Sequence, residues 1–226
     1  MKFESIEEMN SLLIRCVRCP RLVKFRVEVA ERKSRFIGEE FWSKPVPGFG
    51  NINSSLLILG LAPAATGGNR TGRVFTGDKS ASFLFSCLYE TGLSNRADSI
   101  SIDDGLEIQN AYITAALKCV PPQDKPLKEE LHNCSEYLEY EIESMKSLKV
   151  VLALGRIAFD SFKGHLRREG IDVSEITFRH GRGYKVGSIW LYGSYHPSPR
   201  NVNTGRLKRQ DFIAVLNEIK EKFSSP

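Results

Sequence analysis

Four of the five cysteines have the number and spacing of a metal-binding set. Cys16 and Cys19 form a Cys-x2-Cys pair near the start of the chain, and Cys119 and Cys134 follow far downstream. Four thiolates bind either zinc or an iron–sulfur cluster. Zinc sites more often contain two Cys-x2-Cys pairs, but the spacing alone leaves zinc open, and four unrelated buried thiols are the weakest of the three interpretations. Cys87 lies in an apolar helical stretch and is expected in the core.

A polar loop at residues 64–79 is the second candidate site. It follows an apolar run at residues 56–61 and carries a single carboxylate, Asp78, and a single aromatic residue, Phe75. Open α/β sheets bind their ligands in loops at the carboxyl ends of central strands. The ordinary alternatives are that Asp78 caps a helix starting near Lys79 and that Phe75 packs in the core. A helix cap and a catalytic carboxylate are compatible roles for one Asp.

The third candidate site is the segment 196–201, which has the sequence His-Pro-Ser-Pro-Arg-Asn and follows an apolar run at residues 188–195. Because the carboxyl ends of parallel strands lie at the same edge of a sheet, we expect His196 and the loop of Asp78 to face one cleft. A lone histidine is commonly structural. This one follows a strand, is held between prolines and lies in a stretch without acids, which favours a functional role.

The elements that must position these residues alternate between strands and helices. Apolar runs predict four strands, at residues 55–61, 111–117, 150–155 and 188–195. Helical spacing predicts helices at residues 5–15, 21–35, 80–90, 128–147, 156–168 and 207–223. This alternation predicts an α/β fold with a central, mainly parallel four-stranded sheet and helices on both faces. We expect a single domain, residues 1–226, with a cysteine-bearing amino-terminal extension over about residues 1–53.

The charge of the chain is modest overall but uneven. The net charge is +5, yet residues 176–210 hold seven Lys and Arg and no acid, whereas residues 129–143 hold six acids and no Lys or Arg. A basic face suits a polyanion such as nucleic acid, and chance clustering on a solvated surface is an equal alternative. No apolar run is long enough to cross a bilayer and residues 1–4 do not begin a secretion signal, so we expect a cytoplasmic protein without membrane contact, in which disulfides are rare.

Taken together, these motifs resemble those of the uracil-DNA glycosylase superfamily, in particular its iron–sulfur branch, usually called family 5 or type b. Residues 60–63, 68–73 and 75–78 look like the first family motif, residues 196–207 look like the second, and residues 112–122 look like the strand between them. The resemblance extends from Cys16 to about Leu207.

The resemblance implies a three-layer α/β/α sandwich and a [4Fe–4S] cluster bound by the four spaced cysteines, with zinc as the alternative. It also implies a DNA repair enzyme that flips uracil out of DNA and hydrolyses its N-glycosidic bond, leaving an abasic site. Most of the superfamily has a polar water-activating residue where this chain has Ala62, and a base-reading Asn where it has Ala115. The type b proteins lack both groups, which implies broader excision of deaminated bases, including hypoxanthine and xanthine. Gln123 and Asp124 are candidates to replace part of the lost Asn.

The resemblance also implies roles for individual residues. Asp78 and His196 would be catalytic: Asp78 would orient water and stabilise a cationic sugar, and neutral His196 would donate a hydrogen bond to the departing base. The base would be bound by Ala62, Pro63, Phe75, Ala115 and His196, with Phe75 stacking on it. DNA would be contacted by Asn69, Arg70, Arg73, Ser198, Arg200, Asn201 and Arg206.

Two other functions are compatible with parts of the sequence. The chain could be a non-catalytic iron–sulfur protein that binds damaged or single-stranded DNA, which a test for released base would distinguish. A nucleotide-handling enzyme is less favoured, because no Gly-x-Gly-x-x-Gly follows any predicted strand. Under the favoured hypothesis the partner is DNA with uracil or another deaminated base, and we expect a monomer.

Overall fold

The computed structural model describes residues 3–32, 36 and 38–223. Within these residues, six strands form one sheet in the order β1-β3-β2-β4-β6-β5. Their bounds are β1 (Phe49–Gly50), β2 (Leu56–Gly60), β3 (Ala111–Ala115), β4 (Val150–Leu154), β5 (Gly183–Val186) and β6 (Ile189–Ser194). The inner strands β3, β2, β4 and β6 are parallel, and the edge strands β1 and β5 are antiparallel to their neighbours.

The four strands predicted from apolar runs are confirmed as the parallel centre of this sheet. β2 is buried at every position, and its Ile58 pairs with Ile113 of β3 and with Leu152 of β4. Strands with helices on both faces need apolar residues on both sides, which explains the continuous runs.

The expected four-stranded sheet is wrong in number, because two short edge strands extend it. β1 is only two residues long, and β5 contains half-buried and exposed residues, so neither has the apolar run that indicates a strand. At Gly50 a Cβ would lie 2.5 Å from the carbonyl oxygen of Ala111, so this close pairing requires glycine.

The long helices were predicted, with small shifts at their ends. They are α1 (Ile6–Leu13), α2 (Pro20–Glu31), α4 (Lys79–Glu90), α5 (Lys128–Ser144), α6 (Arg156–Arg168) and α8 (Arg209–Phe223). The second predicted helix, 21–35, ends at Glu31, and residues 33–35 lie outside the described residues. The sequence did not predict the short helices α3 (Gly68–Thr71), η1 (Pro122–Asp124, a 3-10 helix) and α7 (Pro199–Asn203).

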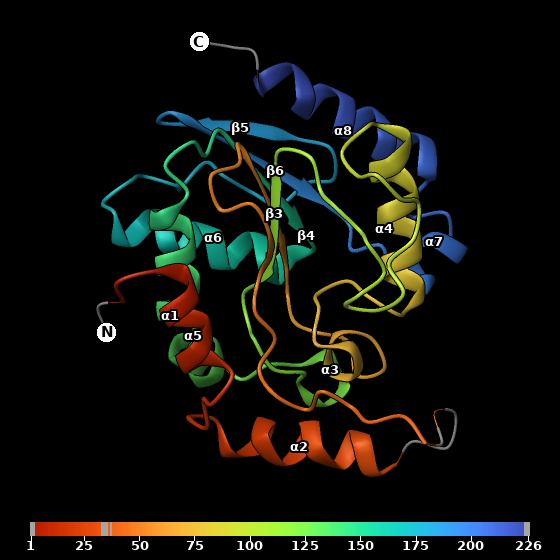
Figure 1. The fold of residues 1–226 in the computed structure, drawn as a ribbon. Helices are drawn as coiled ribbons and strands as arrows, with labels where there is room; N and C mark the ends of the chain where they lie inside the picture. The colour runs from red at the N-terminus through yellow and green to blue at the C-terminus, as the bar shows by residue number, and fades with distance from the viewer. Residues whose placement is uncertain (1–2, 33–35, 37, 224–226) are drawn as a thin grey trace.

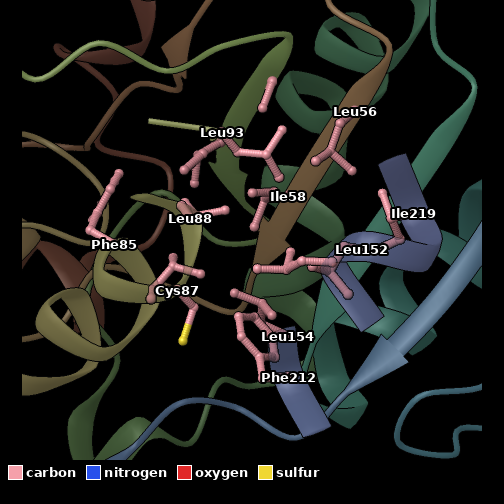
Figure 2. Close-up of a cluster of buried hydrophobic side chains, with 14 of the residues drawn as sticks. Leu56, Ile58, Phe85, Cys87, Leu88, Leu93, Leu152, Leu154, Phe212 and Ile219 are labelled. Carbon is pink, nitrogen blue, oxygen red and sulfur yellow. The ribbon is translucent and has the colours of Figure 1, made fainter. Parts of the chain in front are cut away.

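Helices cover both faces of the sheet (Figure 1). On one face, Ile58 and Leu152 pack with Phe85 of α4 and Phe212 of α8, as Figure 2 shows. Cys87 of α4 is fully buried in this cluster, which confirms its prediction as a core residue. On the other face, α5 and α6 contribute a second apolar cluster.

A third cluster attaches the amino-terminal segment to the sheet. Met9 and Leu13 of α1 and Leu22 of α2 are buried against Leu117 and Tyr137. Figure 1 shows α1 beside α5, and α2 across the end of the sheet next to α3. Among the described residues, no helix is both apolar enough and long enough to cross a membrane.

Candidate active site and cysteine cavity

A cavity of about 350 Å³ opens at the carboxyl edge of the parallel strands. Ala62 lines it from the segment after β2, Ala115 from the end of β3, and Ser198 from the segment after β6. Phe75, Asp78 and His196 also line it, so the structure brings together side chains that are far apart in the sequence. This arrangement follows from the parallel strands, whose carboxyl ends meet at one edge.

Asp78 is both the cap of α4 and part of the cavity wall. Its Oδ1 accepts a hydrogen bond from the backbone N–H of Ala81 at 2.9 Å. Its Oδ2 lies against Gly67, where a Cβ would come within 2.1 Å of that oxygen, so any larger residue at this position would displace the carboxylate. Burial raises the pKa of Asp78, while the N–H groups of Ala81 and Ser80 and the charge of Arg70 act in the opposite direction.

Phe75 has a strained backbone that places its ring in the cavity wall. Its φ of 49° lies in the left-handed region, which costs a non-glycine residue about 1–3 kcal/mol. The ring lies against Gly60, where a Cβ would be 2.9 Å from the ring carbon Cε2. It also stacks on His196, with ring centroids 5.9 Å apart and an interplanar angle of 29°. The aromatic face and the imidazole therefore form one continuous wall.

His196 is held in place by its own loop. Its carbonyl oxygen accepts hydrogen bonds from Asn201 Nδ2 and from the backbone N–H of Ser198, both at 2.8 Å. Burial lowers the pKa of His196, and the nearby carboxylate of Asp124 partly opposes this effect. The imidazole is therefore neutral at pH 7, and a neutral imidazole can donate one hydrogen bond.

Of the two candidates to replace the lost Asn, Asp124 lies in the cavity wall and Gln123 does not. Asp124 lines the cavity from η1, and both Gln123 and Asp124 have left-handed φ angles, of 57° and 56°. Non-glycine residues are uncommon in the left-handed region. Two in succession make a strained turn, and this turn places the Asp124 carboxylate in the cavity wall. The sequence indicated this location only by the position of Asp124 in the segment after β3, which reaches the same edge of the sheet as the other two loops.

Two residues expected to contact DNA are buried inside the protein. Arg73 forms an ion pair with Asp104 at 2.7 Å, which, with backbone hydrogen bonds to Asp104, lowers the pKa of that carboxyl to about 2 despite its burial. Asn69 is 1% exposed and donates to the carbonyl oxygen of Arg26 at 3.1 Å. In this structure neither side chain is available to a DNA backbone, and both hold the loop before Asp78.

The other residues expected to contact DNA are closer to solvent. Arg200 in α7 and Arg206 after it are exposed, and the guanidinium of Arg206 lies 4.3 Å from the ring centroid of Tyr195. Ser198 caps α7 and accepts from the backbone N–H of Asn201. Arg70 is mostly covered, because it pairs with Glu39 at 2.7 Å.

The four spaced cysteines line a second cavity, between α2, α5 and the segment after β3. Among the described residues, no three His, Cys, Asp or Glu side chains are grouped so that they could hold one metal ion. The four cysteine thiols are nevertheless a donor set that fits either an iron–sulfur cluster or zinc.

Hydrogen-bond donors surround these sulfurs. Cys134 Sγ accepts from the backbone N–H of Lys118 at 3.3 Å, and Cys119 Sγ accepts from Arg26 at the same distance. Burial raises the pKa of the Cys119 thiol to about 11 and that of Cys134 to about 12, so these thiols need a metal to become thiolates at neutral pH.

Comparison with protein families identifies the fold and its motifs. Residues 47–220 match the model of the Uracil DNA glycosylase superfamily. The chain belongs to this superfamily. A type-5 uracil-DNA glycosylase of Thermus thermophilus is 46% identical over 215 residues, which are 95% of this chain and 96% of the relative. A type-5 enzyme of Pyrobaculum aerophilum is 45% identical, over 93% of this chain and 90% of its own length.

Within the superfamily, the chain belongs to the type-5 branch. A type-4 uracil-DNA glycosylase of Sulfurisphaera tokodaii is only 27% identical, over 94% of this chain and 84% of its own length. The resemblance drawn from the sequence motifs is thereby confirmed. The superfamily match includes every residue that lines the cavity, and it leaves Cys16 and Cys19 outside.

Proposed function

We propose that this chain is a uracil-DNA glycosylase that hydrolyses the N-glycosidic bond of uracil in DNA and leaves an abasic site for repair. One observation carries the proposal: in a chain of the type-5 branch, Phe75, Asp78 and His196 line a single cavity at the carboxyl edge of the sheet. An aromatic face, a carboxylate and a neutral imidazole are the groups that this reaction uses.

The reaction begins when the target nucleotide leaves the base stack, because the bond is inaccessible inside a duplex. The flipped base enters the cavity and stacks on the ring of Phe75. The strained backbone of Phe75 and its contact with Gly60 fix this ring before the base arrives. Because the ring is already ordered, binding of the base costs less conformational entropy.

His196 stabilises the departing base. As the bond breaks, negative charge develops on the base, and a neutral imidazole N–H donates a hydrogen bond to its carbonyl oxygen. The hydrogen bonds that the His196 carbonyl oxygen accepts from Ser198 and Asn201 hold the ring in position. Asn201 therefore acts by bracing this loop rather than by contacting DNA.

Asp78 orients the water that attacks the sugar and stabilises the positive charge that develops there. Because Oδ1 is occupied by the cap of α4, Oδ2 is the oxygen that acts. Ala62 cannot replace it, since a methyl group binds no water.

Arg200, Arg206 and Ser198 contact the DNA backbone, and Arg70 adds a positive charge behind the Asp78 loop. We do not assign DNA contacts to Asn69 and Arg73, which are buried and already paired. Each arginine that meets a phosphate releases counterions, which makes binding depend on salt. One chain contains every group that the reaction requires, so the proposed active form is a monomer.

Cys16, Cys19, Cys119 and Cys134 hold a [4Fe–4S] cluster in this proposal. When bound, the cluster supplies four iron–sulfur bonds that fasten the amino-terminal segment to α5 and to the end of β3. The cysteines pack in the third apolar cluster and none of them lines the active cavity, so we assign them the role of holding the fold.

The cavity also favours deaminated bases other than uracil, namely hypoxanthine and xanthine. Ala62 and Ala115 present methyl groups where an amide would select one base by hydrogen bonding. A site without such a group has no buried donor to leave unpaired when a different base enters, so it discriminates weakly. The volume of about 350 Å³ is within the range of small-molecule sites.

Base release from a panel of oligonucleotides tests this proposal. Matched strands carry uracil, hypoxanthine, xanthine or a normal base at one position, both single-stranded and in duplex. We expect free uracil and a smaller release of the two purines, with none from normal DNA. Tight binding of the lesion strands without release of any base would instead indicate a non-catalytic DNA-binding protein.

A further inference from the structure

Arg26 of α2 is a buried cation at the wall of the cysteine cavity. Arg26 is only 6% exposed to solvent and lines this cavity. Its Nη1 donates to Cys119 Sγ at 3.3 Å and to the carbonyl oxygen of Cys16 at 3.4 Å. Its Nε is buried and has no hydrogen-bond partner. None of the carboxylates that the structure describes forms an ion pair with it.

A buried guanidinium without an anion is unfavourable, because the lost hydration of the charge is not replaced. Lys118, the other buried cation of this region, has the anionic partner that Arg26 lacks among the described residues. Lys118 lines the same cavity, but its Nζ pairs with Glu141 at 2.6 Å and the carboxylate also accepts from Thr114. Lys118 therefore needs no further anion, whereas the charge of Arg26 faces only sulfur and a backbone carbonyl.

We infer that Arg26 is the charge partner of the anionic iron–sulfur centre that the four cysteines hold. Thiolates bound to a cluster carry the negative charge that neutral thiols lack, and they accept hydrogen bonds from N–H groups. Arg26 is a positioning residue: its Nη1 orients the sulfur of Cys119, and its charge offsets that of the centre. This inference rests on the proposed cluster and not on the proposed reaction with DNA.

Arg26 also connects the cysteine cavity to the active-site loop. Its backbone carbonyl oxygen accepts a hydrogen bond from Asn69 Nδ2 in α3, at 3.1 Å. The next segment of the chain after α3 leads to Phe75 and Asp78. Helix α2 therefore has one residue that contacts a cysteine of the cavity through its side chain and the active-site loop through its backbone.

The test compares three variants of the cluster-loaded protein, purified without oxygen. Arg26→Gln keeps N–H donors but removes the charge, and Arg26→Lys keeps the charge. Lys24→Gln is the matched control, because it removes one positive charge from the same helix at a side chain that is 80% exposed. The readouts are iron and sulfide content, the rate of iron release to a chelator, and the midpoint potential of the cluster.

We expect iron release from Arg26→Gln to be about tenfold to a hundredfold faster than from the wild type, because removing a partner of a metal ligand weakens metal binding by about that factor. Its midpoint potential should fall, because the positive charge that favours the added electron is gone. Arg26→Lys should retain the wild-type midpoint, with release between the two, and Lys24→Gln should match the wild type. A merely structural role does not move the midpoint potential.

A wild-type release rate and midpoint in Arg26→Gln would overturn the inference. If Arg26→Gln does not fold, Arg26→Lys decides: retained iron with a wild-type midpoint supports the charge role, and lost iron or a shifted midpoint contradicts it. A wild-type protein without iron would instead overturn the proposed cluster, so the two failures are distinguishable.

Discussion

At the scale of single residues, Asp78 combines two functions that have different requirements. The cap of α4 requires only an acceptor oxygen at Oδ1, whereas catalysis requires a charge near the sugar. Burial raises the pKa of this carboxyl, so its charged form is held at some cost to stability. This combination is common where a residue is selected for reaction rather than for stability.

Asp78→Asn separates the two functions, because Asn caps helices about as well as Asp but carries no charge. We expect single-turnover release of uracil to fall roughly a hundredfold or more, as when water orientation and charge stabilisation are lost. A carboxyl whose pKa is raised by folding destabilises the folded state above that pKa, where it is charged. The melting temperature at neutral pH should therefore stay the same or rise.

A near-normal rate in Asp78→Asn would contradict the catalytic role of Asp78 and leave helix capping as its only role. Loss of the cap would cost about 1 kcal/mol of stability, but Asn preserves the cap. If capping were the only role of Asp78, Asp78→Asn would therefore leave both the rate and the melting temperature nearly unchanged.

His196 gives a prediction for pH. Because burial lowers the pKa of His196 below its usual value of 6.5, the neutral donor persists at neutral pH and is lost only in acid. Asp124 raises this pKa by stabilising the imidazolium, so Asp124→Asn should lower it further. We expect the acid limb of the single-turnover rate to move to lower pH in this variant. The control is Asp98→Asn, at an exposed carboxylate, and a limb that stays in place or moves to higher pH in Asp124→Asn would contradict the assignment.

At the scale of elements, continuous apolar runs predicted the four inner strands because those strands are buried on both faces. The edge strands β1 and β5 gave no such signal, since β1 has only two residues and β5 is mostly half-buried or exposed. The short helices α3, η1 and α7 were missed because helices of three to five residues are set by their loops and caps. The parallel direction of the inner strands followed from their alternation with helices, whereas the strand order and the extra edges were not predicted.

The element around α7 gives a prediction for DNA binding. Replacing Arg200 or Arg206 by Ala should weaken binding to lesion and normal DNA equally. It should also flatten the dependence of log affinity on log salt by about one unit for each lost phosphate contact. Arg167→Ala is the control, because Arg167 is exposed near the carboxyl-terminal end of α6, far along the chain from the cavity loops. An unchanged slope in both Arg200→Ala and Arg206→Ala would show that these charges are merely solvated.

The cysteine-bearing elements give a prediction for metal content. The purified protein should be brown, with about four irons per chain and the broad absorption of an iron–sulfur cluster. Replacing Cys16 or Cys119 by Ser should reduce the iron, whereas Cys87→Ser should not, since Cys87 is buried in the core between α4 and α8. Stoichiometric zinc in a colourless sample prepared without oxygen would contradict the cluster.

At the scale of the whole molecule, the sheet positions the active cavity at its carboxyl edge, and the segment that carries the first two cysteines lies across the end of the sheet (Figure 1). The shared edge was predictable, because parallel strands end together. The burial of Asn69 and Arg73 was not, since both were expected to contact DNA from their motif alone. Their partners, Arg26 and Asp104, lie 43 and 31 positions away, and only the folded chain brings them together.

Release of free uracil under single-turnover conditions tests whether this chain hydrolyses the N-glycosidic bond. The protein is held in excess over a duplex with one uracil, and free uracil is quantified together with alkali-sensitive abasic strands. We expect one uracil and one abasic site for each duplex, and no free base from the same duplex with cytosine at that position. Stable binding of the uracil duplex with no free uracil and no abasic site would contradict it.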